Sequence, residues 1–431
     1  MSMSRKVVVT GYSIGSPAGY TLEENRACWT GGKYCFSEIT TFNLAGSSVR
    51  FAGQCPKPDV KKLPDRKVQK ILTRKDVISL LVTLDAAQHA GLKAGTFDPE
   101  RCGMYVGAPS TQIGDLTEYF TIVKNCVEDG KFDSKKFGRD LMELVNPLVV
   151  LQTLMNNGLC FGTMSLDIRG VNANFMDFQA SGLRAVGEAF RSIVYDRADV
   201  IVAGGIAGTV EPFHMAEGVR AGFIARTIDP GIRPEETVRP YDATRRGAIL
   251  SDGAAYMVLE EESHAIKRGA TIYGRLHGFG LANDGAVDFM REEKSPGLGR
   301  AIVAALQDAG MDRGEIGLIE GQGNGSGSYD MAEASAILDV YGKNAQKIPL
   351  HSCKGVMGEM GEAAGVVSLI IALEALKDKV VPKTFNFHEG DEVTSQCAVR
   401  DEVQEVYSDK ALVVSRNFLG LAAAMVVSLP D

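Results

Sequence analysis

The chain has 431 residues, of which 45% are hydrophobic and 23% charged, and its 48 glycines follow no collagen-like period. This composition excludes a fibrous or disordered protein, and the length predicts roughly two to three domain-sized units. Lys and Arg number 46 against 54 Asp and Glu, a formal net charge of −8, and such a surface has no general attraction for nucleic acid or anionic lipid.

The 8 cysteines and 6 histidines show no metal-binding spacing, because the sequence has neither a CxxC pair nor an HExxH motif. We therefore expect no metal site and no cofactor. The cysteines are scattered, and most stand within apolar runs, so we interpret them as reduced core residues of a cytoplasmic protein. The sequence predicts no signal peptide and no membrane-spanning segment.

Short β-branched runs alternate with longer amphipathic segments in the first part of the chain. Strands are expected at Val7–Thr10, Cys102–Gly107, Asp199–Gly204 and Ala254–Glu260, and helices at Val77–Ala90 and Gly182–Val194. The helices are predicted from apolar residues spaced three and four apart. The third strand is a continuous apolar run of the kind that is buried on both faces.

The same alternation then restarts near residues 265–270. Strands are expected at Ile272–Phe279, Ile316–Glu320, Ile348–His351, Leu412–Ser415 and Met425–Leu429, and helices at Gly299–Ala309, Ala332–Val340 and Ala363–Leu376. Strands alternating with helices indicate an α/β fold with mostly parallel sheets. Because no linker separates the two series, we predict two similar halves, 1–267 and 268–431, that pack as one body.

Three glycine-containing segments each join a strand to the start of a helix, at residues 173–182, 319–327 and 350–365. Such elbows place side chains and backbone N–H groups at the positive end of a helix, where oxyanions are stabilised. The alternative is that the glycines only permit tight turns and close packing. The second elbow lacks the Gly-Lys-Ser/Thr ending of a phosphate-binding loop.

Taken together, the elbows resemble those of the β-ketoacyl synthases, and the resemblance extends over nearly the whole chain. It includes residues 5–11 with 16–19, and the stretch 239–247 followed by Asp252-Gly-Ala. The resemblance implies the thiolase-like fold, in which two pseudo-symmetric halves form a five-layered α-β-α-β-α core.

The resemblance also implies that the catalytic groups are missing. The family uses a Cys nucleophile at a helix N-terminus and two His, and the matching positions here are Gln179, Gln322 and Glu359, with Lys354 five residues before the last. Glutamine is no nucleophile and cannot shuttle a proton near neutral pH. An ionised Glu359 would oppose an oxyanion, and we hypothesise that Lys354 and Glu359 form a compensating pair.

Loss of all three groups resembles one branch of the family, the chain length factors, or ketosynthase β subunits, of bacterial type II polyketide synthases. It implies a non-condensing subunit that forms a heterodimer with a catalytic ketosynthase and shapes the tunnel for a polyketide delivered by acyl carrier protein. One alternative is a malonyl-carrier-protein decarboxylase that uses Gln179. Another is a divergent condensing enzyme that uses Cys353 or Cys160.

By the same resemblance, the chain-length positions match Ile113, Leu116 and Phe120. Their spacing places them on one helix face, although ordinary core packing has the same pattern. Phe418 matches the family's gating Phe, but two flanking glycines are lost, and a core aromatic is the alternative. The densest basic stretch, residues 57–75, is either a solvated face or a contact for an acidic carrier protein or the partner subunit.

Overall fold

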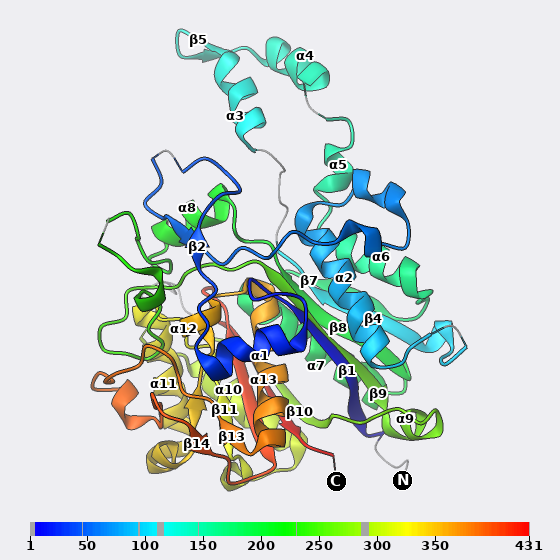
Figure 1. The fold of residues 1–431 in the computed structure, drawn as a ribbon, viewed down its shortest axis with the longest axis vertical. Coiled ribbons are helices and arrows are strands. Elements are labelled where there is room, and N and C mark those ends of the chain that lie inside the picture. Colours follow the sequence, from blue (N-terminus) through cyan, green and yellow to red (C-terminus); the bar gives the residue numbers. More distant parts are fainter. Residues whose placement is uncertain are drawn as a thin grey trace.

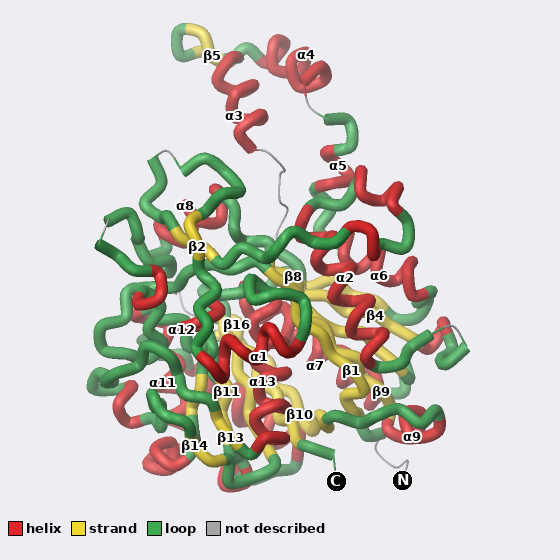
Figure 2. Tube along the Cα trace, in the orientation of Figure 1, coloured by secondary structure: helices red, strands yellow, loops and turns green. Residues whose placement is uncertain are grey.

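The computed structural model describes residues 5–44, 46–93, 95–109, 116–144, 146–229, 231–285 and 293–430. Its main sheet has 10 strands in the order β12-β11-β15-β16-β10-β1-β9-β8-β4-β7 (Figures 1 and 2). The strands of the first half are β1 (Val7–Gly15), β4 (Cys102–Gly107), β7 (Asn172–Phe175), β8 (Val200–Ala207) and β9 (Gly253–Glu261). Those of the second half are β10 (Gly274–Asn283), β11 (Leu318–Glu320), β12 (Leu350–His351), β15 (Lys410–Arg416) and β16 (Leu421–Ser428).

The two halves repeat one topology. Numbered along the chain within each half, the strands follow the spatial order 3-2-4-5-1 in both, and the halves meet where β1 pairs with β10. The expected pseudo-symmetry is therefore confirmed. The boundary between residues 267 and 268 stays a prediction, since this pairing joins both halves in one sheet.

The expectation of mostly parallel strands is wrong, because the sheet is mixed. β4 runs parallel to β7 and β8, and β11 runs parallel to β12 and β15. The remaining pairs, which involve β1, β9, β10 and β16, are antiparallel. Hydrophobic periodicity reports burial and not strand direction, so the two arrangements look alike in a fully buried run.

Helices form three layers around the strands. The central layer consists of α7 (Ser181–Val194) and α13 (Ala364–Asp378), which contact each other and strands of both halves. α2 (Arg74–His89) and α6 (Asn157–Leu166) cover the first half, and α10 (Pro296–Ala309), with α11 (Gly327–Tyr341) packed against it, covers the second. The five-layered α/β core of the thiolase-like fold is thus confirmed.

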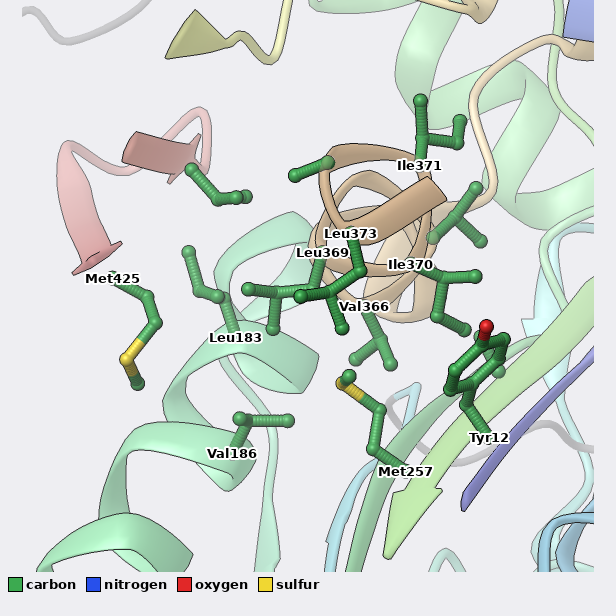
Figure 3. Packing of buried hydrophobic residues seen from close by; sticks show 14 of the residues in the cluster. Tyr12, Leu183, Val186, Met257, Val366, Leu369, Ile370, Ile371, Leu373 and Met425 are labelled. Atoms are coloured by element: carbon green, nitrogen blue, oxygen red, sulfur yellow. The ribbon is translucent and has the colours of Figure 1, made fainter. Parts of the chain in front are cut away.

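Figure 3 shows the apolar packing of the central layer. Leu183 and Val186 of α7 lie close to Leu369 of α13, and Met257 of β9 and Met425 of β16 belong to the same buried cluster. Because α13 is buried along almost its whole length, it has no polar face. This explains why residues 363–376 are apolar on all sides of the helix apart from Ser368 and Glu374.

Strand β1 extends beyond its predicted end for a tertiary reason. β1 continues past Gly11 to Gly15 because a shift of register between Val9 and Gly11 lets its pairing with β9 resume. A Cβ at Gly11 would lie 2.5 Å from the backbone nitrogen of Ala90, so the close approach of α2 requires glycine there.

The other elements are short or lie at the surface. They are α1 (Leu22–Gly31), α5 (Val149–Gln152), α8 (Pro212–Arg220), α9 (Glu262–Lys267), α12 (Lys354–Met357), β2 (Ser37–Glu38), β3 (Phe51–Ala52), β13 (Val380–Val381) and β14 (Gln404–Glu405). Within the described ranges, no helix is long and apolar enough to cross a membrane.

One segment projects from the layered body, at the top of Figure 1. It consists of α3 (Leu116–Asn125), β5 (Val127–Glu128), β6 (Lys131–Phe132) and α4 (Ser134–Leu144), and we call it the arm. Large apolar side chains are exposed on it, including Phe120, Phe132, Met142 and Leu144. The arm therefore does not bury its apolar face against the body.

Candidate functional site

The first elbow places Gln179 in a short 3₁₀ turn, Phe178–Ala180, directly before α7. Phe178 has φ 50°, a left-handed conformation that is costly for a bulky residue. The turn is held by the Ser415 hydroxyl, which donates to the Gln179 carbonyl oxygen at 2.8 Å. Gln179 is only 5% exposed, and its side-chain oxygen Oε1 has no hydrogen-bond partner.

The second elbow is a loop whose backbone N–H groups are bound by carboxylates of α11. Glu333 accepts from the N–H of Gln322 at 2.6 Å and of Gly323 at 2.8 Å. Asp330 accepts from the N–H of Asn324 at 2.9 Å and of Gly325 at 3.0 Å. Because these four donors are already bonded within the chain, they do not form a free cradle for a phosphate.

The third elbow carries Lys354 and Glu359, both buried. Gln322 Nε2 donates to Glu359 Oε2 at 2.8 Å, and Glu359 Oε1 has no partner. Burial raises the pKa of Glu359 to about 7, while the charge of Lys354 and the Gln322 hydrogen bond lower it. The direct Lys354–Glu359 ion pair that we hypothesised is not among the ion pairs of the described residues, so Lys354 acts on Glu359 only through space.

The three elbows meet through the side chain of Gln322. Its Nε2 bonds Glu359, and its Oε1 lies 3.1 Å from the Ser415 hydroxyl, which also reaches the backbone of Gln179. Ser415 lies on β15 and was not anticipated from the sequence, because nothing distinguishes it from another strand serine. The candidate residues Gln179, Gln322, Lys354 and Glu359 are therefore assembled at one buried place.

The two glutamine side chains at this place can only form hydrogen bonds. The amides of Gln179 and Gln322 neither attack a thioester nor exchange a proton near neutral pH. The nearby thiol of Cys353 precedes α12 and is buried, and burial raises its pKa to about 12. Cys160 lies within α6 and not at a helix N-terminus, and burial raises its pKa also. Neither thiol is an activated nucleophile.

A small, partly open hollow of about 40 Å³ lies beside Gln179. The ring of Phe418 packs against that of Phe178, with centroids 4.3 Å apart, and both rings line the hollow. Glu362 and Thr209 line it too, and Glu362 Oε2 and Thr209 Oγ1 have no hydrogen-bond partner. Burial raises the pKa of Glu362 to about 7. Sequence reasoning missed Glu362, since only the fold turns it toward this hollow.

The predicted tunnel residues are placed only in part. Ile113 lies outside the described residues, and Leu116 begins α3, with its side chain outside them as well. Phe120 on α3 is 63% exposed. The alternative of ordinary core packing is therefore wrong for Phe120, whose side chain is mostly exposed in the part of the chain that the structure describes.

The site holds no metal-binding arrangement in the part of the chain that the structure describes, where no three His, Cys, Asp or Glu side chains converge suitably. His351, two residues before Cys353, lies on β12 and is fully buried. Its Nδ1 lies 2.7 Å from Glu320 Oε1 on the neighbouring strand β11. It is a packed strand residue, as its sequence position predicts.

Comparison with known proteins places this geometry in a family. The family model "Beta-ketoacyl synthase, N-terminal domain" matches residues 4–265, and "Beta-ketoacyl synthase, C-terminal domain" matches residues 273–388. The "3-oxoacyl-(acyl-carrier-protein) synthase 2" of Vibrio cholerae is 31% identical over 90% of each chain. A "Putative polyketide beta-ketoacyl synthase 1" of Streptomyces halstedii is 29% identical over 100% of this chain and 99% of its own.

A solved structure of similar fold is "The ishigamide ketosynthase/chain length factor", with a TM-score of 0.86 and 23% identity over 99% of this chain and 100% of that one. The family models together cover well over half of the sequence. The chain therefore belongs to the β-ketoacyl synthase family.

Proposed function

We propose that this chain is the non-condensing, chain-length-determining subunit of a type II polyketide ketosynthase heterodimer. One observation carries the proposal. The side chains at the three elbows, Gln179, Gln322 and Glu359, are buried together and include neither a nucleophile nor an imidazole. Side chains of this kind can line a path for a partner's product, but they cannot form the acyl-enzyme intermediate that condensation needs.

Exposed apolar surface on the arm supports a partner subunit. Phe120, Phe132, Met142 and Leu144 are each more than half exposed, and large apolar side chains exposed together on one segment are typical of an interface. The sheet also ends at β7, whose outer edge pairs with no other described strand. In the proposed heterodimer, the catalytic ketosynthase covers the arm and this edge.

The proposal includes an acyl carrier protein that supplies malonyl units to the complex. Positive charge near the arm's base supports this partner, since the predicted basic stretch is largely at the surface. Its exposed lysines are Lys57, Lys61, Lys62, Lys67 and Lys70. Such a patch attracts an acidic protein and speeds its encounter.

The decarboxylase alternative is disfavoured by the charges beside Gln179. Glu362 and Glu217 both line the adjacent hollow. The cationic group there is His214, whose Nδ1 already bonds Glu211. A malonyl carboxylate bound against Gln179 would lie near these two carboxyl groups without a free positive charge to compensate it, which opposes binding.

The test measures carbon dioxide release and product length from malonyl carrier protein. The isolated chain is expected to release no carbon dioxide above the buffer blank, and the chain mixed with its ketosynthase is expected to give elongated products. Gln179→Ala should leave the complex active, because the proposal gives residue 179 no covalent role. Turnover by the isolated chain, abolished in Gln179→Ala, would instead establish the decarboxylase.

The same assay tests the tunnel residues. In the complex, Leu116→Trp is expected to shorten the product and Phe120→Ala to lengthen it, because the first fills the proposed path and the second empties it. An exposed aromatic far from the arm, Tyr407, gives the control Tyr407→Ala, which should leave the product unchanged. Unchanged products from both tunnel variants would refute their assignment while leaving the subunit role intact.

A further inference from the structure

Two cysteines outside the elbows lie in direct contact. Cys28 is in the last turns of α1, and Cys35 follows the end of that helix. Their sulfur atoms are 3.2 Å apart, within hydrogen-bond distance for thiols. A third cysteine, Cys353, is close enough to influence Cys35 electrostatically, but among the described residues no hydrogen bond joins their sulfurs.

The end of α1 explains this contact. Gly32 caps the helix in the left-handed conformation, with φ 73°, and its N–H donates to the Cys28 carbonyl. The chain therefore reverses direction and returns Cys35 over the last turn of the helix. A side chain at Gly32 would collide with the ring of Phe385, at 2.4 Å from a new Cβ, so the reversal is tightly packed.

The segment that follows Gly32 and carries Cys35 is also fixed on its other side. The N–H of Cys35 donates to the Val356 carbonyl at 3.0 Å. Val356 lies in α12, the short helix between Lys354 and Glu359. The two sulfurs are thus held together by the helix end on one side and by the third elbow on the other, and neither needs a large movement to approach the other.

We infer that Cys28 and Cys35 are an oxidative modification site, at which a peroxide converts the two thiols into a reversible disulfide. A disulfide needs the sulfurs at roughly 2.05 Å, so an approach of little more than an ångström suffices. Cys28 is fully buried, but Cys35 is partly exposed, and a small oxidant reaches the pair from that side.

The chemistry balances with hydrogen peroxide as the oxidant. The thiolate of the pair attacks a peroxide oxygen, which forms a sulfenic acid and releases hydroxide. The second sulfur then forms the S–S bond and displaces water, so the thiols lose two electrons and the peroxide becomes two waters. The hydrogen bond from Cys35 lowers the pKa of Cys28, which favours a thiolate in the pair.

The proposal does not depend on the subunit's partner or product, so its test uses the chain by itself. The protein is treated with hydrogen peroxide, free thiols are blocked with N-ethylmaleimide, and tryptic peptides are analysed by mass spectrometry. Cleavage after Arg26, Lys33 and Arg50 separates the two cysteines. A disulfide therefore appears as a crosslink between peptides 27–33 and 34–50, and dithiothreitol should abolish it.

The single tryptophan, Trp29, is next to Cys28 and buried, and it gives a second readout. Since a disulfide quenches a neighbouring indole, fluorescence is expected to fall on oxidation and recover on reduction. The unfolding temperature should rise by a few degrees in the oxidised protein, because the closed loop restricts the unfolded chain.

Cys28→Ser and Cys35→Ser should each remove the crosslink and the fluorescence change, and the partly exposed Cys35 makes the second variant the safer one to fold. Cys160→Ser, also at a partly buried cysteine, should change neither. Peroxide that leaves peptides 27–33 and 34–50 separately blocked by maleimide, or that links Cys35 to Cys353, would overturn the inference.

Discussion

Glu359 is a carboxyl group without access to water, bonded on one oxygen to an amide and unpartnered on the other. Desolvation penalises its charged form, so its pKa rises to about 7. Below pH 7, Glu359 is therefore neutral in most of the protein molecules and acts as a hydrogen-bonding group. Gln322 and Gln179 are neutral at every pH, so these three side chains are mostly uncharged below pH 7.

The raised pKa makes stability depend on pH in a definite direction. Between about pH 4.5 and 7, the folded Glu359 binds more protons than the unfolded one, so its contribution is full below pH 4.5 and is lost as pH rises through 7. Glu359→Gln keeps an acceptor for Gln322 and removes the charge. We expect it to raise the free energy of unfolding at pH 8, by at most about 3 kcal/mol, and to change it little at pH 4.5.

Urea unfolding at the two pH values measures this difference. Glu402→Gln, at an exposed glutamate, is the matched control and should have little effect at either pH. If the stability difference between Glu359→Gln and the unchanged protein is the same at both pH values, folding does not raise the pKa of Glu359 and the neutral-site description fails.

Elements meet closely where the first and third elbows face each other. The start of α7 packs against the turn Gly361–Ala363. A Cβ at Gly182 would lie 2.2 Å from the Glu362 carbonyl oxygen, and a Cβ at Gly205 of β8 would lie 2.1 Å from the same atom. These glycines allow backbone-to-backbone contact between the two halves, which side chains would prevent.

Gly182→Ala is therefore expected to lower the free energy of unfolding by about 2 kcal/mol or more, because backbone must shift to admit the methyl group. The control is Gly138→Ala inside α4, where nothing lies within 4 Å of a new Cβ. That change should be neutral or stabilise by up to about 1 kcal/mol. Denaturant unfolding measures the free energy of unfolding of both variants. Equal values would contradict the argument that backbone contact requires glycine at position 182.

The arm gives a prediction about assembly. Met142 on α4 is 84% exposed in the isolated chain, and the proposed partner would cover it. Met142→Asp should weaken association with the ketosynthase at least tenfold, since a charge would be buried in an apolar contact. Tyr407→Asp, at a residue 77% exposed near β14, is the control and should associate normally.

Size-exclusion chromatography with light scattering, followed by titration calorimetry, measures this association. Because Met142 packs against little of its own chain, the variant should retain its unfolding temperature. Normal association by Met142→Asp would exclude α4 from the interface.

At the scale of the whole molecule, the two halves share their central layer. α7 comes from the first half and α13 from the second, yet each contacts strands of both halves. The sheet is also continuous from β10 to β1. Neither half can bury its inner face without the other, so they should fold as one cooperative unit.

We therefore expect a single unfolding transition. The fluorescence of Trp29 reports on the first half, and far-ultraviolet circular dichroism reports on all helices. The unfolding curves from the two measurements should coincide. Leu369→Ala, in α13 of the second half, should shift both curves together and cost about 2–5 kcal/mol. A Trp29 transition that does not move with the dichroism would show that the halves unfold independently.

The local sequence was sufficient to predict the positions of most helices and strands and to identify the altered site residues. Cys102–Gly107 is a strand with the predicted bounds, and the predicted helix Gly182–Val194 begins only one residue earlier. Their apolar spacing and glycine boundaries are properties of a few neighbouring residues. The resemblance of the elbows likewise singled out Gln179, Gln322, Lys354 and Glu359.

Only the tertiary structure decided the direction of the strands, the contacts between distant side chains and the pKa of Glu359. A strand buried on both faces is a continuous apolar run whether its neighbours are parallel or antiparallel. The hydrophobic pattern of the sequence therefore could not predict the mixed sheet. Ser415, Glu362 and the Cys28–Cys35 contact depend on which distant segments become neighbours. Glu359 bonds Gln322 instead of Lys354 because burial makes its charge costly, and burial is a property of the folded chain and not of any one segment.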